Sequence, residues 1–198
     1  MHATTFSNEF TLRDFLVKNF SLNNVGQINR EGIVHRLDRV TSGLVVCPLN
    51  SKSYNEFQIG FKDRKITKKY KAIVEGFLKS NSGEINLPLA HSKKNRKKRE
   101  VNKNGRNSIT LFETIEKTSK YTYLDLNLIT GRNHQIRAHF EHLGNPVAND
   151  TLYGAKKISF IDSSTICLQS YYLSFTLNSE NFTFEIEQPD YFTSLLSV

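Results

Sequence analysis

The sequence predicts an α+β fold in which a mixed, largely antiparallel sheet carries a few flanking helices. Several segments alternate apolar and polar residues, which is typical of strands with one buried face. Only a few segments repeat apolar residues at the three- and four-residue spacing of an amphipathic helix. Strands and helices do not alternate regularly along the chain, so a parallel sheet with crossover helices is not expected.

The first half of the chain contains two predicted helices and two predicted strands. Thr11 to Phe20 repeats apolar residues on one helical face and predicts a short amphipathic helix. Gly43 to Leu49, the longest uncharged apolar segment, predicts a buried strand. Ser51 is placed to cap a second helix that ends near Asp63. Lys69 to Phe77 then alternates as a half-buried strand does.

The second half adds a pair of strands, one helix and a hairpin. Ile109 to Ile115 and Tyr121 to Ile129 alternate and are expected to be antiparallel neighbours. Thr130 to Gly144 predicts a helix with one apolar stripe, ended by its glycine and a proline just beyond. Leu173 to Ile186 predicts a hairpin around the polar turn Asn178 to Asn181.

The positive charge of the chain is concentrated in one segment. The formal net charge is +8, and residues 93–106 hold eight basic side chains against one acid, a local balance of +7. Clustered cations on an otherwise balanced domain are typical of contact with a nucleic-acid backbone, because binding releases counterions. The alternative is a solvated, disordered loop. The basic residues are Lys93, Lys94, Arg96, Lys97, Lys98, Arg99, Lys103 and Arg106.

Cysteine usage and the absence of long apolar segments bound the class of protein. Cys47 and Cys167 lie in apolar runs and form no Cys-x-x-Cys pair, which favours free thiols in a reducing compartment. No segment has the length of a signal peptide or of a bilayer span. We therefore expect a soluble, cytoplasmic protein with no membrane partner. The chain has no repeat or linker, so residues 1–198 are expected to form one domain, and nothing indicates a dimer face.

The carboxylate of Asp38 lies between two arginines in a polar turn. The segment from His35 to Leu44 reads His-Arg-Leu-Asp-Arg-Val-Thr-Ser-Gly-Leu, so Arg36 and Arg39 flank the aspartate. Positive charge on both sides favours an ionised carboxylate. Taken alone, an aspartate beside arginine more often forms a surface ion pair.

Two further motifs follow in the order of one known family. Lys68 to Gly76 reads Lys-Lys-Tyr-Lys-Ala-Ile-Val-Glu-Gly, and Thr130 to His139 reads Thr-Gly-Arg-Asn-His-Gln-Ile-Arg-Ala-His. Together with His35 to Leu44, they resemble the motifs of the RluA-like pseudouridine synthases. Gly144 to Pro146 and Asp150 to Gly154 match two minor motifs of that family.

The resemblance extends from about Glu31 to about Phe192 and implies an enzyme that isomerises a uridine in RNA. Such an enzyme breaks the bond between base and ribose, turns the uracil and rejoins it through carbon 5, without a cofactor or a metal. It requires a carboxylate that attacks or deprotonates the nucleotide, a pocket for the extruded base, and a cation beside the carboxylate. The implied substrate is structured RNA, either rRNA or a tRNA stem-loop.

The resemblance also assigns roles to five residues. Asp38 matches the catalytic aspartate. Tyr70 matches the aromatic residue that packs on the flipped base, although its spacing also suits an ordinary core tyrosine. Arg137 matches the cation that pairs with the aspartate; a solvated helix arginine is the alternative. Arg36 is expected to fill the space of the extruded base or to hold the backbone, and Arg132 to contact phosphate or close an internal ion pair.

The sequence departs from the family pattern in several places. The family's Asn-Lys-Pro-x-Gly strand is missing ahead of the first helix, so the protein is either a pared-down version or truncated at its start. A sheet edge or part of the active-site wall is expected to differ. No S4-type RNA-binding segment precedes the domain, so the catalytic domain and its basic loop are expected to recognise RNA unaided. Leu168-Gln169-Ser170 stands where Leu-His-Ala is customary, and Asn149 stands where glycine is usual. The last two changes are expected to affect packing more than catalysis.

Two other classes of protein compete with this interpretation. One is a catalytically inactive RNA-binding or ribosome-associated module of the same fold, for which the basic loop would suffice. The other is a metal-dependent hydrolase built on His134, His139 and His142. At that spacing the imidazoles point around the helix, and no His-Glu-x-x-His is present, so no metal site is expected.

Overall fold

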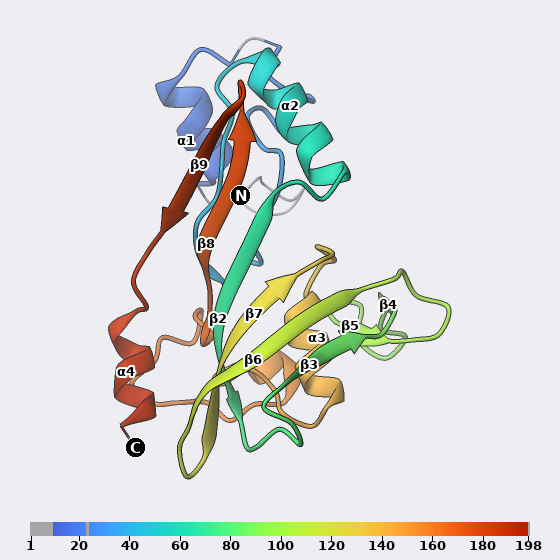
Figure 1. Cartoon of the computed structure of the whole chain (residues 1–198), viewed down its shortest axis with the longest axis vertical. Helices are drawn as coiled ribbons and strands as arrows, with labels where there is room; N and C mark the ends of the chain where they lie inside the picture. The colour runs from blue at the N-terminus through green and yellow to red at the C-terminus, as the bar shows by residue number, and fades with distance from the viewer. Residues whose placement is uncertain (1–9, 23, 198) are drawn as a thin grey trace.

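The computed structural model describes residues 10–22 and 24–197, and its main feature is a seven-stranded sheet (Figure 1). Within these residues the strand order is β1-β8-β2-β7-β6-β3, and β9 also pairs with β8. Only β1 and β8 run parallel, so the mixed, largely antiparallel sheet is confirmed. A separate two-stranded sheet contains β4 and β5. The strands are β1 (Ser42–Gly43), β2 (Thr67–Glu75), β3 (Ser82–Asn86), β4 (Leu89–His91), β5 (Arg99–Val101), β6 (Ile109–Lys117), β7 (Tyr121–Leu128), β8 (Leu168–Leu177) and β9 (Glu180–Glu185).

The helices lie in two groups at the ends of the sheet. Figure 1 shows α1 and α2 beside β9 at one end, with α3 and α4 toward the other. In the described part of the chain no helix is long and apolar enough to cross a membrane. The helices are α1 (Leu12–Asn19), α2 (Ser51–Lys62), α3 (Gln135–His142), α4 (Asp190–Leu196) and the short 3-10 helix η1 (Thr151–Tyr153).

Helices α3 and α4 cover opposite faces of the sheet. The strand register places Tyr70 and Phe112 on one face, because successive residues of a strand point to opposite sides. Phe140 of α3 packs on that face, with its ring centroid 6.1 Å from that of Phe112. Phe192 of α4 packs on Tyr123, which points to the other face, at 6.0 Å. The face that carries Tyr70 is therefore the face that α3 covers.

Several predicted elements are confirmed. Helix α1 begins with a capping box between Thr11 and Asp14. Helix α2 begins at Ser51, but the cap is Asn50, whose side-chain oxygen accepts a hydrogen bond from the N–H of Ser53 (2.9 Å). The alternating segments form β2, β6 and β7, and the last predicted hairpin forms β8 and β9. Local patterning therefore accounts for the centre of the sheet.

Between Gly43 and Leu49 the chain forms much less strand than predicted. After β1, the N–H of Leu44 donates to the carbonyl of Ser170 (2.8 Å), and the chain then leaves the sheet. Val46 and Cys47 pack against the apolar clusters around α1 and α2. The prediction of a strand was wrong because burial without strand pairing has the same short apolar pattern as a buried strand.

Helix α3 begins at Gln135, later than the predicted start at Thr130. Residues 130–134 form a turn in which the side-chain oxygen of Gln135 accepts hydrogen bonds from the Thr130 hydroxyl (2.8 Å) and from the Arg132 N–H (3.0 Å). His134 ends the turn in the left-handed region, at φ 55°. The polar side chain of Gln135 thus supplies the partners that a longer helix would have supplied through its backbone.

The basic segment is a paired hairpin and not a disordered loop. Residues 89–106, here called the basic hairpin, contain β4 and β5 and the turn between them. The ammonium of Lys98 donates to a carboxylate oxygen of Glu141 on α3 (2.8 Å). The backbone N–H of Arg99 donates to the hydroxyl of Tyr153 (2.8 Å). These contacts hold the basic hairpin against α3 and η1.

Candidate active site

The loop that carries Asp38 is anchored at its start by His35. The Nε2 atom of His35 accepts a hydrogen bond from the N–H of Val46 (2.9 Å), and the imidazole stacks on Phe61 with ring centroids 4.7 Å apart. Burial, with a smaller effect from the positive charge of Lys68, lowers the pKa of His35 to about 3. The ring therefore stays neutral at physiological pH and keeps the lone pair that Val46 requires.

The end of the same loop passes very close to β8. Gly43 has φ +113°, and a Cβ at this position would lie 2.2 Å from the carbonyl oxygen of Ser170. Only glycine permits this approach. Between the two anchors, the N–H of Thr41 donates to the carbonyl of Asp38 (3.0 Å) in a tight turn. The motif residues thus form a loop that is fixed at both ends and presents Asp38 at its centre.

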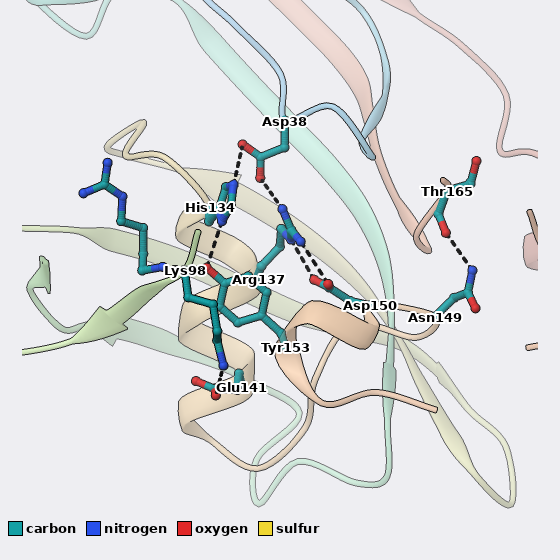
Figure 2. Close-up of polar contacts among 10 residues, drawn as sticks. Asp38, Lys98, His134, Arg137, Glu141, Asn149, Asp150, Tyr153 and Thr165 are labelled. Atoms are coloured by element: carbon teal, nitrogen blue, oxygen red, sulfur yellow. Dashed lines mark hydrogen bonds and ion pairs between the residues drawn. The ribbon is translucent and has the colours of Figure 1, made fainter. Parts of the chain in front are cut away.

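The guanidinium of Arg137 lies between two carboxylates (Figure 2). Its Nη1 atom is 3.4 Å from Oδ2 of Asp38, although the two residues are 99 positions apart in the sequence. Its Nε and Nη2 atoms donate to the two oxygens of Asp150 at 2.7 and 2.9 Å. Burial alone lowers the pKa of Arg137, but Asp150 and Asp38 raise it, and the net direction is upward. The guanidinium remains charged and bridges the two acids.

Asp150 is a site residue that the sequence analysis did not assign. Its side chain is 1% exposed, and that of Arg137 is 4% exposed, so their bidentate pair is buried. Buried charges require such a partner, because an isolated one loses its hydration. The signal was present in the minor motif that runs from Asp150 to Gly154, but no local pattern indicates which cation this acid faces.

His134 faces the other oxygen of Asp38. Its Nε2 atom is 4.0 Å from Oδ1 of Asp38, and its Nδ1 atom is 2.9 Å from the hydroxyl of Tyr153. That hydroxyl already accepts the N–H of Arg99, and burial raises the pKa of Tyr153, so its proton is available to donate to Nδ1. Burial also lowers the pKa of His134. A neutral imidazole that accepts the Tyr153 proton at Nδ1 would carry its own proton on Nε2, toward Asp38.

These side chains open into one cleft of about 490 Å³, a volume that admits a nucleotide. Asp38, Tyr70 and Arg137 all line it, so the three residues expected to act together do meet in one place. Tyr70 is buried, and burial raises its pKa to about 12, partly offset by a hydrogen bond from Ser170. The phenol is therefore neutral. Arg36 also lines the cleft, as do Lys68, Arg99 and Arg132.

The remaining predicted RNA-binding residues belong to the basic hairpin and differ in their surroundings. Four of them are exposed in the turn between β4 and β5: Lys93, Lys94, Arg96 and Lys97. Lys98 is occupied by Glu141 and lies over the ring of Tyr153, 4.8 Å from its centroid. Arg99 lines the cleft. The structure thus separates the free cations of the hairpin from the one that holds it in place.

The three histidines of the predicted alternative metal site do not converge. His139 is fully buried, with Nδ1 3.0 Å from the Thr110 hydroxyl and Nε2 3.0 Å from the carbonyl of Leu87. His142 is exposed, and His134 faces the cleft. Among residues 10–22 and 24–197 no group of three or more His, Cys, Asp or Glu side chains has the arrangement of a metal site. The geometry gives the hydrolase alternative no support.

Asn149 has a physical reason to replace the glycine that is customary at its position. Its φ is +65°, a left-handed conformation that asparagine tolerates better than most residues. Its amide nitrogen donates to the carbonyl of Thr165 (2.7 Å; Figure 2) and to that of Asp162 (3.1 Å). Its oxygen accepts the N–H of Ile158 (2.8 Å). The side chain therefore anchors the loop that supplies Asp150.

The fold and the site have counterparts among known proteins. The chain is similar to the solved structure of human RNA Pseudouridylate Synthase Domain Containing 1, with a TM-score of 0.66, 22% identity, and coverage of 83% of this chain and 79% of that one. At this identity the likeness shows a shared fold. A family model described as RNA pseudouridylate synthase matches residues 12–142. The chain therefore belongs to the RNA pseudouridylate synthase family.

Two curated relatives extend the comparison. A protein of Aquifex aeolicus named as an uncharacterized RNA pseudouridine synthase is 36% identical over 186 residues, covering 89% of this chain and 59% of the relative. The ribosomal large subunit pseudouridine synthase D of Borreliella burgdorferi is 35% identical over 183 residues, covering 91% of this chain and 56% of the relative. The chain spans about half the length of the curated relatives it matches.

Proposed function

We propose that the protein is an RNA pseudouridine synthase that isomerises a specific uridine in structured rRNA or tRNA. The observation that carries this proposal is the pair of Asp38 and Arg137 beside Tyr70 in one nucleotide-sized cleft. Membership of the family and the names of the relatives support the same reaction. The enzyme acts without a cofactor or metal, because the reaction only moves the ribose from the base nitrogen to carbon 5.

In the proposed mechanism the target uridine leaves its stack and enters the cleft, where its base packs on Tyr70. Asp38 attacks or deprotonates the nucleotide as its glycosidic bond breaks. Arg137 holds the carboxylate as the ionised form, and Nε2 of His134 lies 4.0 Å from its second oxygen. When carbon 5 of the turned uracil bonds to the ribose, any bond between Asp38 and the nucleotide breaks, the hydrogen on carbon 5 leaves as a proton, and the freed base nitrogen takes up a proton.

RNA binding is assigned to the cations around the cleft and on the basic hairpin. Arg36 is exposed at the edge of the cleft, where it can fill the space of the extruded base. Arg132 is exposed, and its Nε donates to the carbonyl of Asn107 (3.1 Å), so its remaining N–H groups are placed for a phosphate. The proposal locates the protein in the cytoplasm with these RNAs, acting as a monomer.

An inactive RNA-binding module of the same fold is the second candidate. A binding function requires exposed cations, which the basic hairpin supplies. It does not require a carboxylate that is half-buried against an arginine and a histidine in the cleft. The geometry of Asp38 therefore favours the enzyme.

The experiment replaces Asp38 with asparagine. Wild-type protein should release tritium from carbon 5 of uridine in unmodified RNA transcripts, and Asp38→Asn should bind the same transcripts while releasing none. Asp190→Asn, which makes the same change at an exposed residue of α4, is the matched control and should keep the wild-type rate. Tritium release by Asp38→Asn at the wild-type rate would show that the assigned mechanism is wrong.

A further inference from the structure

A second hollow of about 370 Å³ adjoins the catalytic cleft on the side of α2. It lies between the end of α2 and the turn that leads from β7 into α3, and we call it the cationic groove. The two hollows share five lining residues, so one opens beside the other. The shared residues are Phe61, Lys68, Leu128, Gly131 and Arg132.

The cationic groove carries positive charge without compensation. Lys62, Arg64, Lys68 and Arg132 line it, and none of its described lining residues is acidic. Lys62, Arg64 and Arg132 are exposed. In residues 10–22 and 24–197 no carboxylate lies within ion-pair distance of these four cations. A concave surface lined by one sign of charge concentrates the field and attracts a polyanion.

Lys68 is the least accessible of these cations and, like Arg132, also lines the catalytic cleft. Its ammonium lies 5.3 Å from the ring centroid of Phe61. Gly131 gives it room, because a Cβ at that position would lie 3.3 Å from the Lys68 nitrogen. No oxygen of the described residues accepts a hydrogen bond from it, and burial lowers the pKa of Lys68. A half-buried ammonium without an acceptor is costly until an anion supplies one.

We propose that the cationic groove binds the phosphodiester backbone of the RNA strand beside the flipped uridine. This inference rests on the proposed function, because that function brings an RNA strand to the adjoining cleft. The strand must continue past the extruded nucleotide, and the groove provides a cationic path that starts at Lys68 and passes Arg132 toward Lys62 and Arg64. The groove is lined by the end of α2. The basic hairpin, which contains β4 and β5, lies beside β3 (Figure 1). The RNA is thus held from two sides.

The test neutralises two of the three exposed groove cations and leaves Arg132, because Arg132 also lines the catalytic cleft. Lys62→Gln/Arg64→Gln should weaken binding of a fluorescent oligouridylate, and the slope of log affinity against log salt should become shallower by about 1.4, or about 0.7 for each lost contact with a single strand. The control is Lys79→Gln/Lys120→Gln, which removes the same charge from exposed residues in the β2–β3 and β6–β7 connections. Equal slopes in the two double variants would overturn the proposal.

Lys68 is tested separately by two replacements. Lys68→Met keeps the apolar stem and should lower the salt slope by about 0.7, whereas Lys68→Arg keeps the charge and should restore it. If both variants keep the wild-type slope, Lys68 contacts no phosphate. A thermal unfolding curve for each variant establishes that the folded protein is measured, and the double variant gives an independent result if Lys68→Met does not fold.

Failure of the groove proposal and failure of the proposed reaction give different experimental results. Binding of oligouridylate is measured without turnover, and tritium release is measured on transcripts. A reduced slope in Lys62→Gln/Arg64→Gln would support the groove even if the wild-type protein released no tritium. Tritium release by the wild type together with an unchanged slope would overturn the groove and leave the proposed reaction standing.

Discussion

At the scale of single residues, the position of Arg137 depends on Asp150 as much as on Asp38. The shorter contacts, 2.7 and 2.9 Å, are to Asp150, whereas the contact to Asp38 is 3.4 Å. Asp150 does not line the cleft, so we expect it to act without touching the substrate. It is a positioning residue, which orients the guanidinium that in turn holds the proposed catalytic carboxylate.

Asp150→Asn should reduce both stability and turnover. The amide keeps the shape of the side chain but removes the charge, which leaves Arg137 without its buried partner and costs about 3 to 5 kcal/mol of unfolding free energy. At temperatures where the variant is fully folded, kcat should still fall while KM for the RNA stays unchanged, because only the carboxylate's geometry is altered. Urea unfolding and steady-state tritium release measure the two effects.

A carboxylate on the opposite face of the sheet provides the control. Asp125 accepts hydrogen bonds from the hydroxyl of Tyr171 (3.1 and 3.3 Å) and lies 3.9 Å from the ammonium of Lys71. Asp125→Asn should lower stability without changing kcat. If Asp150→Asn behaved in the same way, its role would be structural only.

At the scale of elements, the side chain of Tyr153 links the basic hairpin to the proposed catalytic centre. Tyr153 of η1 accepts the N–H of Arg99 in β5, hydrogen-bonds His134, and lies over the guanidinium of Arg137, 4.8 Å from ring centroid to the guanidinium carbon. Lys98 adds an ion pair to α3, worth no more than about 1 kcal/mol at a partly exposed site. The hairpin turn can therefore carry free cations while its base stays docked at the cleft.

Neutralising the free cations of the hairpin should weaken RNA binding without disturbing its attachment. Replacing Lys93, Lys94, Arg96 and Lys97 with glutamine should make the slope of log affinity against log salt shallower by about 3 to 4, at 0.7 to 0.9 per phosphate contact. Lys98 is left intact because it pairs with Glu141. Filter binding of structured RNA across a salt series measures the slope, and an unchanged slope would mean that these cations are merely solvated.

At the scale of the whole molecule, the cleft is formed by two groups of elements, one at each end of the sheet. One end holds α1, α2 and β9, and supplies the loop of Asp38 through His35 (Figure 1). The other end holds α3, η1 and the basic hairpin, and supplies Arg137 and Tyr153. The paired long strands β2 and β8 run between the two ends, and β2 contributes Tyr70. The site thus forms only when both ends are folded.

The neutral state of His35 should make global stability depend on pH. The pKa of His35 is about 3 in the folded protein, and its ordinary value is 6.5, so the unfolded chain binds a proton that the folded protein does not. The folded protein therefore keeps its full unfolding free energy, as far as His35 is concerned, above pH 6.5. It loses stability as the pH falls from 6.5 toward 3, by on the order of 4 kcal/mol at the acid end. Urea midpoints across this range measure it.

His35→Gln is the comparison, because glutamine keeps an acceptor for Val46 but does not titrate. The difference in unfolding free energy between wild type and variant should shrink as the pH falls. Carboxylates that titrate in the same range affect both proteins and cancel in the difference. A difference that stays constant with pH would contradict a neutral, buried His35.

The sequence alone determined the central strands, the first two helices and the candidate site residues. Alternation identified β2, β6, β7 and the β8–β9 hairpin, because the pleat itself sorts buried from exposed side chains. The order of the motifs pointed to Asp38, Tyr70 and Arg137. These signals are local, since each depends on neighbours within a few positions of the chain.

The tertiary structure alone decided which of those residues meet and what holds them. The contacts of Arg137 with Asp38 and Asp150, and of Tyr153 with His134, join segments that no local pattern connects. The long strand expected after Gly43 does not form, because local apolar residues do not determine strand pairing. Apolar residues indicate that a segment is buried. The strand with which it pairs lies far away in the sequence, and only the folded sheet determines that pairing.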